Sequence, residues 1–142
     1  MVTIKFKKIN REAKIPKYAN HGDAGMDVFS VEDYTLQPGE RKTFGLGFQA
    51  EFPLGYVANF WDKSGLASNH GLTILGGVID SGYRGEYKVI LLNASKSPFQ
   101  INKGDKIAQL LITPVEHATI EEVVDLEFSE RGEGGFGSTG KQ

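Results

Sequence analysis

The sequence of 142 residues contains no cysteine, which excludes disulfide bonds and thiolate metal sites. Histidine is also scarce. His21, His70 and His117 lack the spacing of a metal-ligand set, so we expect all three at surface or loop positions. No apolar run approaches the length of a membrane span, and the alternating start of the chain does not resemble a signal peptide. We therefore expect a cytoplasmic protein without a membrane partner.

A strong excess of one charge sign is missing as well. With 16 Lys and Arg against 18 Asp and Glu, the net charge is -2, which gives no general attraction to nucleic acid or to an anionic membrane. A polyanionic ligand must then be bound by a few local donors. The length and the hydrophobic fraction of 39% fit one globular domain with its own core.

Glycine and proline, in contrast, recur along the chain. Eighteen glycines and five prolines leave few stretches long enough for a helix of ordinary length. Apolar residues alternate with polar ones over 2–6 and 44–48, which predicts half-buried strands. Turn signals at 37–39, 53–55 and 103–105 separate further predicted strands at 56–61, 86–92 and 106–112. This pattern predicts an all-β subunit, either a sandwich, a jelly roll or a barrel.

The stretch 72–86 is the best candidate for chemistry. Its apolar first part, 72–79, predicts a buried strand that runs into a turn containing Gly82 and Gly85. A carboxylate at the end of a rigid strand, here Asp80, suits a general base that orients a water molecule. The alternative is an ordinary hairpin in which Asp80 caps its own turn, and composition alone favours it.

The C-terminal part of the chain is less regular. The segment 115–128 suits either a helix or a strand by propensity, and we predict a strand at 119–124. The last twelve residues contain five glycines, which is the composition of a flexible tail. They also carry an arginine, an aromatic ring and two hydroxyls, which offer charged donors, a stacking face and phosphate contacts. We interpret 129–142 as a flexible nucleotide-binding lid that follows a β domain spanning 1–128.

Five separated stretches together resemble the five motifs of the trimeric dUTP diphosphatase (dUTPase) family, in the family's order. They are AlaGlyMetAsp at 24–27, LysSerGlyLeuAla at 63–67, GlyValIleAspSerGlyTyrArgGly at 77–85, GlyAspLysIleAlaGlnLeu at 104–110 and ArgGlyGluGlyGlyPheGlySerThrGly at 131–140. Each one alone is weak, because short glycine-containing strings recur by chance. The ordered set is specific and spans nearly the whole chain.

The resemblance implies a jelly-roll-like β-barrel or sandwich subunit with a flexible glycine-rich tail, and a homotrimer with active sites shared between subunits. It also implies Mg²⁺-dependent hydrolysis of dUTP to dUMP and pyrophosphate, which limits uracil incorporation into DNA and supplies dUMP for thymidylate synthesis. By the same resemblance, Asp80 is the catalytic base and Asp27 reaches Mg²⁺ through water. The implied substrate-binding residues are Lys63, Ser64, Gly65, Gly77, Val78, Ile79, Tyr83, Gln109, Arg131, Phe136, Gly137, Ser138 and Thr139.

The resemblance also assigns roles within that set. Ser64 and the N–H of Gly65 are expected on phosphate oxygens, and Gln109 on the phosphates or the attacking water. Tyr83 is expected under the deoxyribose, where it leaves no room for a 2′-hydroxyl, while the backbone of 77–83 pairs with the uracil edge. Without the family, a helix cap at Ser64, a turn cap at Asp27 and ordinary strand positions for Tyr83 and Gln109 explain these residues equally well.

Two departures from the family pattern stand out. The family usually has ProArg before SerGlyLeuAla, whereas this chain has Asp62 and Lys63, so a two-pronged guanidinium is replaced by a point charge with an acid beside it. An acid that often stands two residues after the catalytic Asp is Gly82 here, and we expect little effect from this change.

Two other functions compete with this interpretation. The related dCTP deaminases carry a catalytic Glu at the position that Ile90 occupies in this chain, which makes a deaminase the weaker candidate. A nucleotide-binding regulator of the same fold, with a protein partner, is the non-enzymatic alternative, because such folds host many functions.

Overall fold

The computed structural model describes residues 1–140, which form eleven β strands and one short helix, α1 (Ser64–His70). The strands are β1 (Lys5–Lys8), β2 (Met26–Phe29), β3 (Tyr34–Leu36), β4 (Arg41–Gly45), β5 (Phe48–Glu51), β6 (Tyr56–Trp61), β7 (Leu72–Leu75), β8 (Val78–Ile79), β9 (Lys88–Asn93), β10 (Phe99–Ile101) and β11 (Lys106–Pro114). Each predicted turn triplet separates two of these strands. The prediction of an all-β, jelly-roll-like fold is confirmed.

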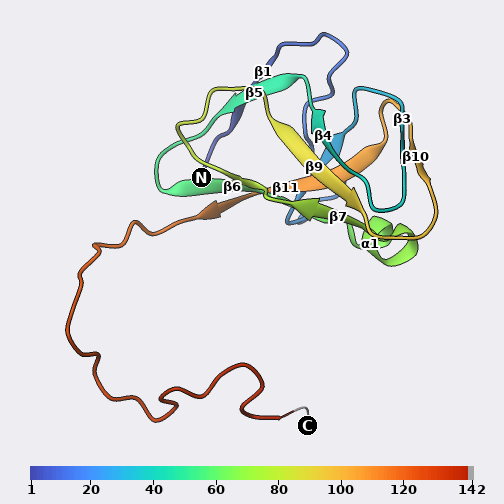
Figure 1. Ribbon diagram of the computed structural model, residues 1–142. Coiled ribbons are helices and arrows are strands. Elements are labelled where there is room, and N and C mark those ends of the chain that lie inside the picture. Colours follow the sequence, from blue (N-terminus) through green and yellow to red (C-terminus); the bar gives the residue numbers. More distant parts are fainter. Residues whose placement is uncertain (141–142) are drawn as a thin grey trace.

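The strands form two larger sheets and two pairs, as Figure 1 shows. One sheet has the order β2-β11-β6-β8 and the other has the order β4-β9-β7, while β1 pairs with β5 and β10 with β3. Every pairing is antiparallel, although many neighbours in a sheet are distant in sequence. Residues far apart along the chain therefore meet across the sheets.

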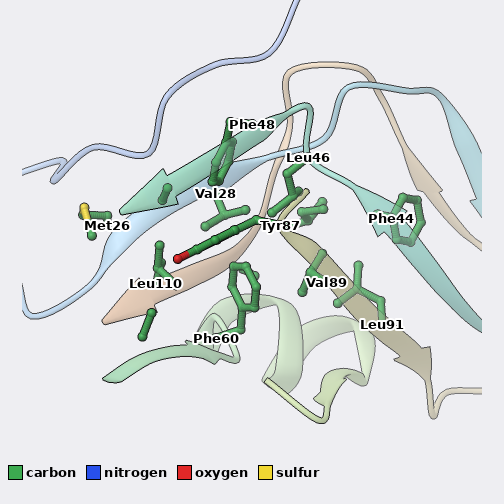
Figure 2. Close-up of a cluster of buried hydrophobic side chains, with 14 of the residues drawn as sticks. Met26, Val28, Phe44, Leu46, Phe48, Phe60, Tyr87, Val89, Leu91 and Leu110 are labelled. Carbon is green, nitrogen blue, oxygen red and sulfur yellow. The ribbon is translucent and has the colours of Figure 1, made fainter. Parts of the chain in front are cut away.

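The core lies between these layers and is built around Tyr87. Figure 2 shows its ring among Phe48, Phe60 and Leu110, with Phe44 on the far side of the cluster. The ring centroid of Tyr87 lies 5.4 Å from that of Phe48 and 6.3 Å from that of Phe60. Because interdigitated aromatic rings fix one another's orientation, this cluster gives the strands around it a rigid base.

The apolar run 72–79 is not one buried strand, so that prediction is wrong. The chain breaks at Gly76 and Gly77, whose φ angles of 68° and 113° are rarely available to other residues. As a result β7 belongs to the sheet of β9 and β8 to the sheet of β6. Val78, predicted to be buried, is 72% exposed. The two glycines thus carry the chain from one sheet to the other just before Asp80.

The predicted strand at 119–124 is absent. The last strand ends at Pro114, and the residues from 115 to 130 form no helix or strand and are exposed, Ile120 by 96% and Val124 by 99%. A strand needs a neighbour for its backbone hydrogen bonds, and this segment leaves the β body, as Figure 1 shows. Residues 141–142 of the predicted lid lie outside the described residues.

Helix α1 was not predicted as an element of its own. It begins at Ser64, ends at His70 and is capped by the left-handed Gly71, whose N–H donates to the carbonyl of Ala67. Lys63 occupies the N-cap position without a side-chain capping hydrogen bond to the helix, and Ser64 is the first helical residue rather than the cap. In the described part of the chain no helix is long and apolar enough to cross a membrane.

Candidate active site

The turn that carries Asp80 borders a hollow of about 220 Å³. Asp80 follows β8 directly, and its carbonyl accepts the N–H of Tyr83 at 3.1 Å, which closes the turn. The hollow, called the Asp80 hollow below, is lined by Val78, Ile79, Asp80, Tyr83, Glu86 and Lys88. The structure thus brings four predicted site residues together, with Gly77 beside them on the chain.

Tyr83 forms a fixed wall of the Asp80 hollow. Its hydroxyl donates to the carbonyl of Glu86 at 2.9 Å, so the ring bridges the turn. A Cβ on Gly85 would lie 2.3 Å from that hydroxyl, which explains why glycine is needed beneath the ring. Tyr83 remains 43% exposed and presents a flat surface of fixed orientation to a ligand.

Glu86 and Lys88 line the hollow too, although neither was predicted as a site residue. The Glu86 carboxylate accepts the N–H of Gly47 at 2.9 Å and so ties the turn to the connection between β4 and β5. The spacing of Glu86 and Lys88 could have indicated that both line one surface, because residues two apart in an extended segment share a face.

A second group of predicted site residues meets across β2, β11 and β6. Gln109 on β11 lies opposite Asp27 on β2 and opposite Trp61 on β6. The carboxylate of Asp27 is 2.5 Å from the ammonium of Lys63 and 3.0 Å from that of Lys106. We call these three charged residues, Asp27, Lys63 and Lys106, the Asp27 cluster.

Asp27 is 4% exposed, yet it is held in the charged form. Burial by itself raises the pKa of this carboxyl, but the hydrogen bonds and charges of Lys63 and Lys106 outweigh burial and hold the pKa below its ordinary value. Both carboxylate oxygens are engaged, one by each lysine. Asp27 is therefore an ion-paired anchor rather than a turn cap.

The side chain of Gln109 is fixed by the chain segment that follows β6. Its amide Nε2 donates to the carbonyl of Asp62 at 2.8 Å. A Cβ on Gly25 would lie 2.3 Å from its Oε1, so glycine in the first motif gives this side chain its space. Gln109 is partly buried and held on both sides, which is not a solvated strand position.

Ser64 and Gly65 open α1 next to the Asp27 cluster. Both are exposed, and no atom lies within 4 Å of where a Cβ of Gly65 would be. N–H groups in the first turn of a helix have no acceptor inside it. A ligand oxygen can therefore approach this segment without displacing protein atoms.

Lys63 and Asp62 are adjacent in the sequence, but their side chains bind different partners. Lys63 points to Asp27, whereas the Asp62 carboxylate accepts hydrogen bonds from Thr73 and Ile74 on β7. Asp62 and Gln109 also border a larger hollow of about 620 Å³ that extends to Val78.

The Asp27 cluster and the Asp80 hollow are separate places on one subunit. Asp27 lies on β2 and Asp80 follows β8, at opposite edges of the same sheet. Strand spacing and the offset along β6 put them on the order of 20 Å apart. Two groups at this distance within one subunit cannot both contact the same reacting bond.

The predicted tail residues lie at neither place. Residues Arg131, Phe136, Gly137, Ser138 and Thr139 are absent from the lining of both hollows in the described chain. Arg131 donates to the carbonyl of Gly134 at 2.6 Å, and Phe136 is fully exposed with a positive φ of 47°. Figure 1 shows the tail extending away from the β body.

The fold and these two sites define a class: a jelly-roll-like β protein in which a carboxylate borders a small hollow and a lysine–aspartate cluster stands apart from it. A family model described as dUTPase matches residues 11–140. This match covers most of the chain, and the chain belongs to the dUTPase family.

Similar proteins agree with this assignment. The deoxyuridine 5'-triphosphate nucleotidohydrolase of Clostridium kluyveri is 51% identical over 136 residues, covering 94% of this chain and 95% of its own length. That of Nautilia profundicola is 51% identical over 140 residues, covering 97% and 99%.

Solved structures extend the comparison to the fold. A variant dUTPase of Staphylococcus bacteriophage 80alpha with dUpNHpp superposes with a TM-score of 0.93 at 29% identity, covering 98% of this chain and 99% of its own. A variant dUTPase of S. aureus phage phi11, which coordinates a structural Mg(II) ion, has a TM-score of 0.82 at 28% identity, covering 89% and 99%.

Proposed function

We propose that this chain acts in the cytoplasm as a dUTP diphosphatase, which hydrolyses dUTP to dUMP and pyrophosphate. The observation that carries the proposal is the Asp80 hollow. A carboxylate at the end of a paired strand and an aromatic wall locked by its own hydroxyl together border a space suited to a pyrimidine nucleoside. Family membership supplies the substrate.

Asp80 is the general base of the proposed reaction. It accepts a proton from a water molecule whose oxygen bonds to the α-phosphorus of dUTP. The bond between the α-phosphorus and the oxygen bridging to the β-phosphorus breaks, and pyrophosphate leaves with that oxygen. Asp80 suits this role because β8 and the closed turn fix its position.

The base and sugar contacts follow from the same hollow. The backbone of Val78 and Ile79 is extended and pairs with β6, and Gly77 before them accepts the N–H of Phe60, so this segment offers directed donors and acceptors to the uracil edge. Tyr83 faces the deoxyribose, and its ring leaves no space beside C2′ for a hydroxyl. Selectivity against UTP then comes from a side chain held in one orientation.

The phosphates are assigned to the other site. Ser64 through its hydroxyl, Gly65 through its N–H and Gln109 through its amide are the neutral donors. Lys63 adds a positive charge after it turns from Asp27 to the triphosphate. Lys106 stays on Asp27, so the buried carboxylate keeps a partner when Lys63 leaves.

Mg²⁺ is the proposed cofactor and is held mainly by the triphosphate. Residues 1–140 contain no group of three or more metal-binding side chains, and both oxygens of Asp27 are engaged by lysines. Asp27 therefore fits contact through metal-bound water, once Lys63 has moved, rather than direct coordination. When bound, Mg²⁺ supplies charge neutralisation for the phosphates.

A homotrimer with shared sites accounts for the separation of the two groups. If the Asp80 hollow of one subunit faces the Asp27 cluster of another, nucleoside and triphosphate contacts meet at an interface. The lid over 129–142 then closes on the site of a different subunit. Arg131 binds phosphate, Phe136 stacks on the base, and Gly137, Ser138 and Thr139 add phosphate contacts.

A pyrophosphate-release assay across dUTP, dCTP, UTP and dTTP tests the function. We expect release from dUTP alone at an appreciable rate, and Asp80→Asn should bind dUTP while turnover falls on the order of a hundredfold or more. Conversion of dCTP to a uracil nucleotide would identify a deaminase. Binding of dUTP without any turnover by the wild type would identify a regulator.

A further inference from the structure

We propose that Asp62 is a positioning residue for the triphosphate: its carboxylate latches the junction of β6 and α1 to β7 and so places the phosphate-binding segment. This inference rests on the proposed function of that segment. It concerns the position where the family usually has proline. A proline restrains a junction through its ring, whereas Asp62 restrains it through side-chain hydrogen bonds.

The two carboxylate oxygens of Asp62 are both used on β7. Oδ2 accepts the hydroxyl of Thr73 at 2.7 Å, and Oδ1 accepts the N–H of Ile74 at 2.7 Å. Hydrogen bonds to an ionised acceptor at this distance are among the stronger ones in proteins. Because β6 and β7 belong to different sheets, these bonds tie the two sheets together at the base of α1.

The backbone of Asp62 is also hydrogen-bonded to Gln109. Its carbonyl accepts Nε2 of Gln109 at 2.8 Å, so one residue joins β7 through its side chain and β11 through its main chain. The direction of the Gln109 amide therefore depends on where the Asp62 peptide lies. Gln109 has little freedom to compensate, since Gly25 is directly against its Oε1.

The position of the Asp62 backbone also determines where the next residues lie. Lys63 comes next and reaches Asp27, and Ser64 starts α1. A rotation of the Asp62 peptide shifts these donors together with Gln109. Small displacements of positioned groups weaken binding and catalysis strongly, because each donor must meet a fixed phosphate oxygen.

The Asp80 hollow is the internal reference for a test. None of its lining residues is a hydrogen-bond partner of Asp62, and in the proposed function it takes the nucleoside part of the substrate. Loss of the latch should therefore weaken a ligand that carries the triphosphate and spare deoxyuridine. A general loss of structure would weaken both.

The experiment measures the Kd of a non-hydrolysable α,β-imido analogue of dUTP and the inhibition constant of deoxyuridine. We expect Asp62→Ala to weaken the analogue roughly tenfold, the equivalent of one charge-assisted hydrogen bond, and to leave deoxyuridine within about twofold. Asp62→Asn keeps an acceptor for Ile74 and should recover most of the affinity. Thr73→Val, which removes one bond and keeps the charge, should lie in between.

Asp33→Ala is the matched control. Asp33 is an exposed aspartate that also accepts a distant backbone N–H, that of Lys103 at 2.7 Å, but it lines neither hollow and is not part of the Asp27 cluster. This variant should bind both ligands as the wild type does. Thermal melting and the mass of the assembly verify that each variant is folded.

An unchanged analogue affinity in folded Asp62→Ala and Thr73→Val would overturn the inference, as would equal losses for both ligands. Should Asp62→Ala not fold, Asp62→Asn and Thr73→Val decide alone. Ser64→Ala distinguishes the phosphate-binding role of the segment from the positioning role of Asp62. If Ser64→Ala weakens the analogue and the Asp62 variants do not, the phosphate assignment holds and Asp62 is merely structural. If the wild type neither binds the analogue nor hydrolyses dUTP, the proposed function and this inference fall together.

Discussion

The ammonium of Lys63 lies 2.5 Å from the carboxylate of Asp27, a residue 36 positions earlier in the chain. Lys106 holds the same carboxylate from the other side. The ammonium of Lys63, which is proposed to bind the triphosphate, is thus ion-paired with the buried carboxylate of Asp27. Since Lys106 remains as a partner, releasing Lys63 does not leave Asp27 uncompensated.

Replacing Lys63 tests whether its ammonium binds the triphosphate. Lys63→Ala should raise the KM for dUTP roughly tenfold, because a phosphate contact to a charged donor is lost. Lys63→Arg should keep or lower KM, since a guanidinium bonds phosphate with two prongs. Steady-state kinetics on both variants measure this, with Lys5→Ala as the control because Lys5 forms an exposed pair with Glu51. Wild-type kinetics in both Lys63 variants would make Lys63 a purely structural partner of Asp27.

Tyr83 offers a test of sugar discrimination. Tyr83→Ala should open space beside C2′ and lower the ratio of kcat/KM for dUTP over UTP on the order of tenfold or more. Tyr83→Phe keeps the ring but loses the hydrogen bond to the Glu86 carbonyl that orients it, so it should lose less discrimination than Tyr83→Ala. Kinetics with both nucleotides measure the ratio. An unchanged ratio in Tyr83→Ala would remove Tyr83 from the sugar site.

The shared-site arrangement predicts complementation between two inactive variants. Deleting residues 131–142 should leave a folded trimer with slow turnover, because the lid that orders the triphosphate is gone. Asp80→Asn should be inactive for lack of its base. When the two are unfolded together and reassembled, some sites receive an intact Asp80 and an intact tail from different chains, and activity should return. A trimeric mixture, verified by mass, whose activity never exceeds the sum of its parents would contradict shared sites.

The hydroxyl of Tyr87 predicts a stability change without a change of function. It is buried and has no hydrogen-bond partner among the described residues, and burial raises its pKa to about 12. Because the folded-state pKa lies above the ordinary 10.0, Tyr87 contributes no pH dependence below pH 10, and stability falls as the pH rises from there toward 12. Tyr87→Phe should lack that part of the alkaline loss and should match or exceed wild-type stability at neutral pH, by up to about 1 kcal/mol. Denaturant unfolding at pH 7 and at pH 11 measures both effects; a clear destabilisation at pH 7 would reveal a partner for the hydroxyl.

The sequence was informative where local chemistry decides the structure. The turn after Asp80 was predicted because a β-branched run followed by glycines specifies a strand and then a turn. Strand pairing is a different matter. β7 pairs with β9 and β8 with β6 because of contacts between residues far apart in the sequence, and residue propensity does not predict such contacts. The adjacent Gly76 and Gly77 were the one local sign of a break.

The Asp27 cluster and the Asp62 latch were beyond sequence reasoning for a related reason. Asp27 stands among apolar residues of a strand, which signals burial and the need for a partner. Its partners come from positions 63 and 106, and no spacing rule links them. Asp62 was noted only as the acid beside Lys63, whereas its side chain binds β7 and that of Lys63 binds Asp27.

The passage of the chain from one sheet to the other at Gly76 and Gly77 also bears on the position of Asp80. β7 is held by β9 and β8 by β6, so the two glycines take up their native path only when both sheets exist. The position of Asp80 therefore depends on both sheets of the subunit and not on β8 alone.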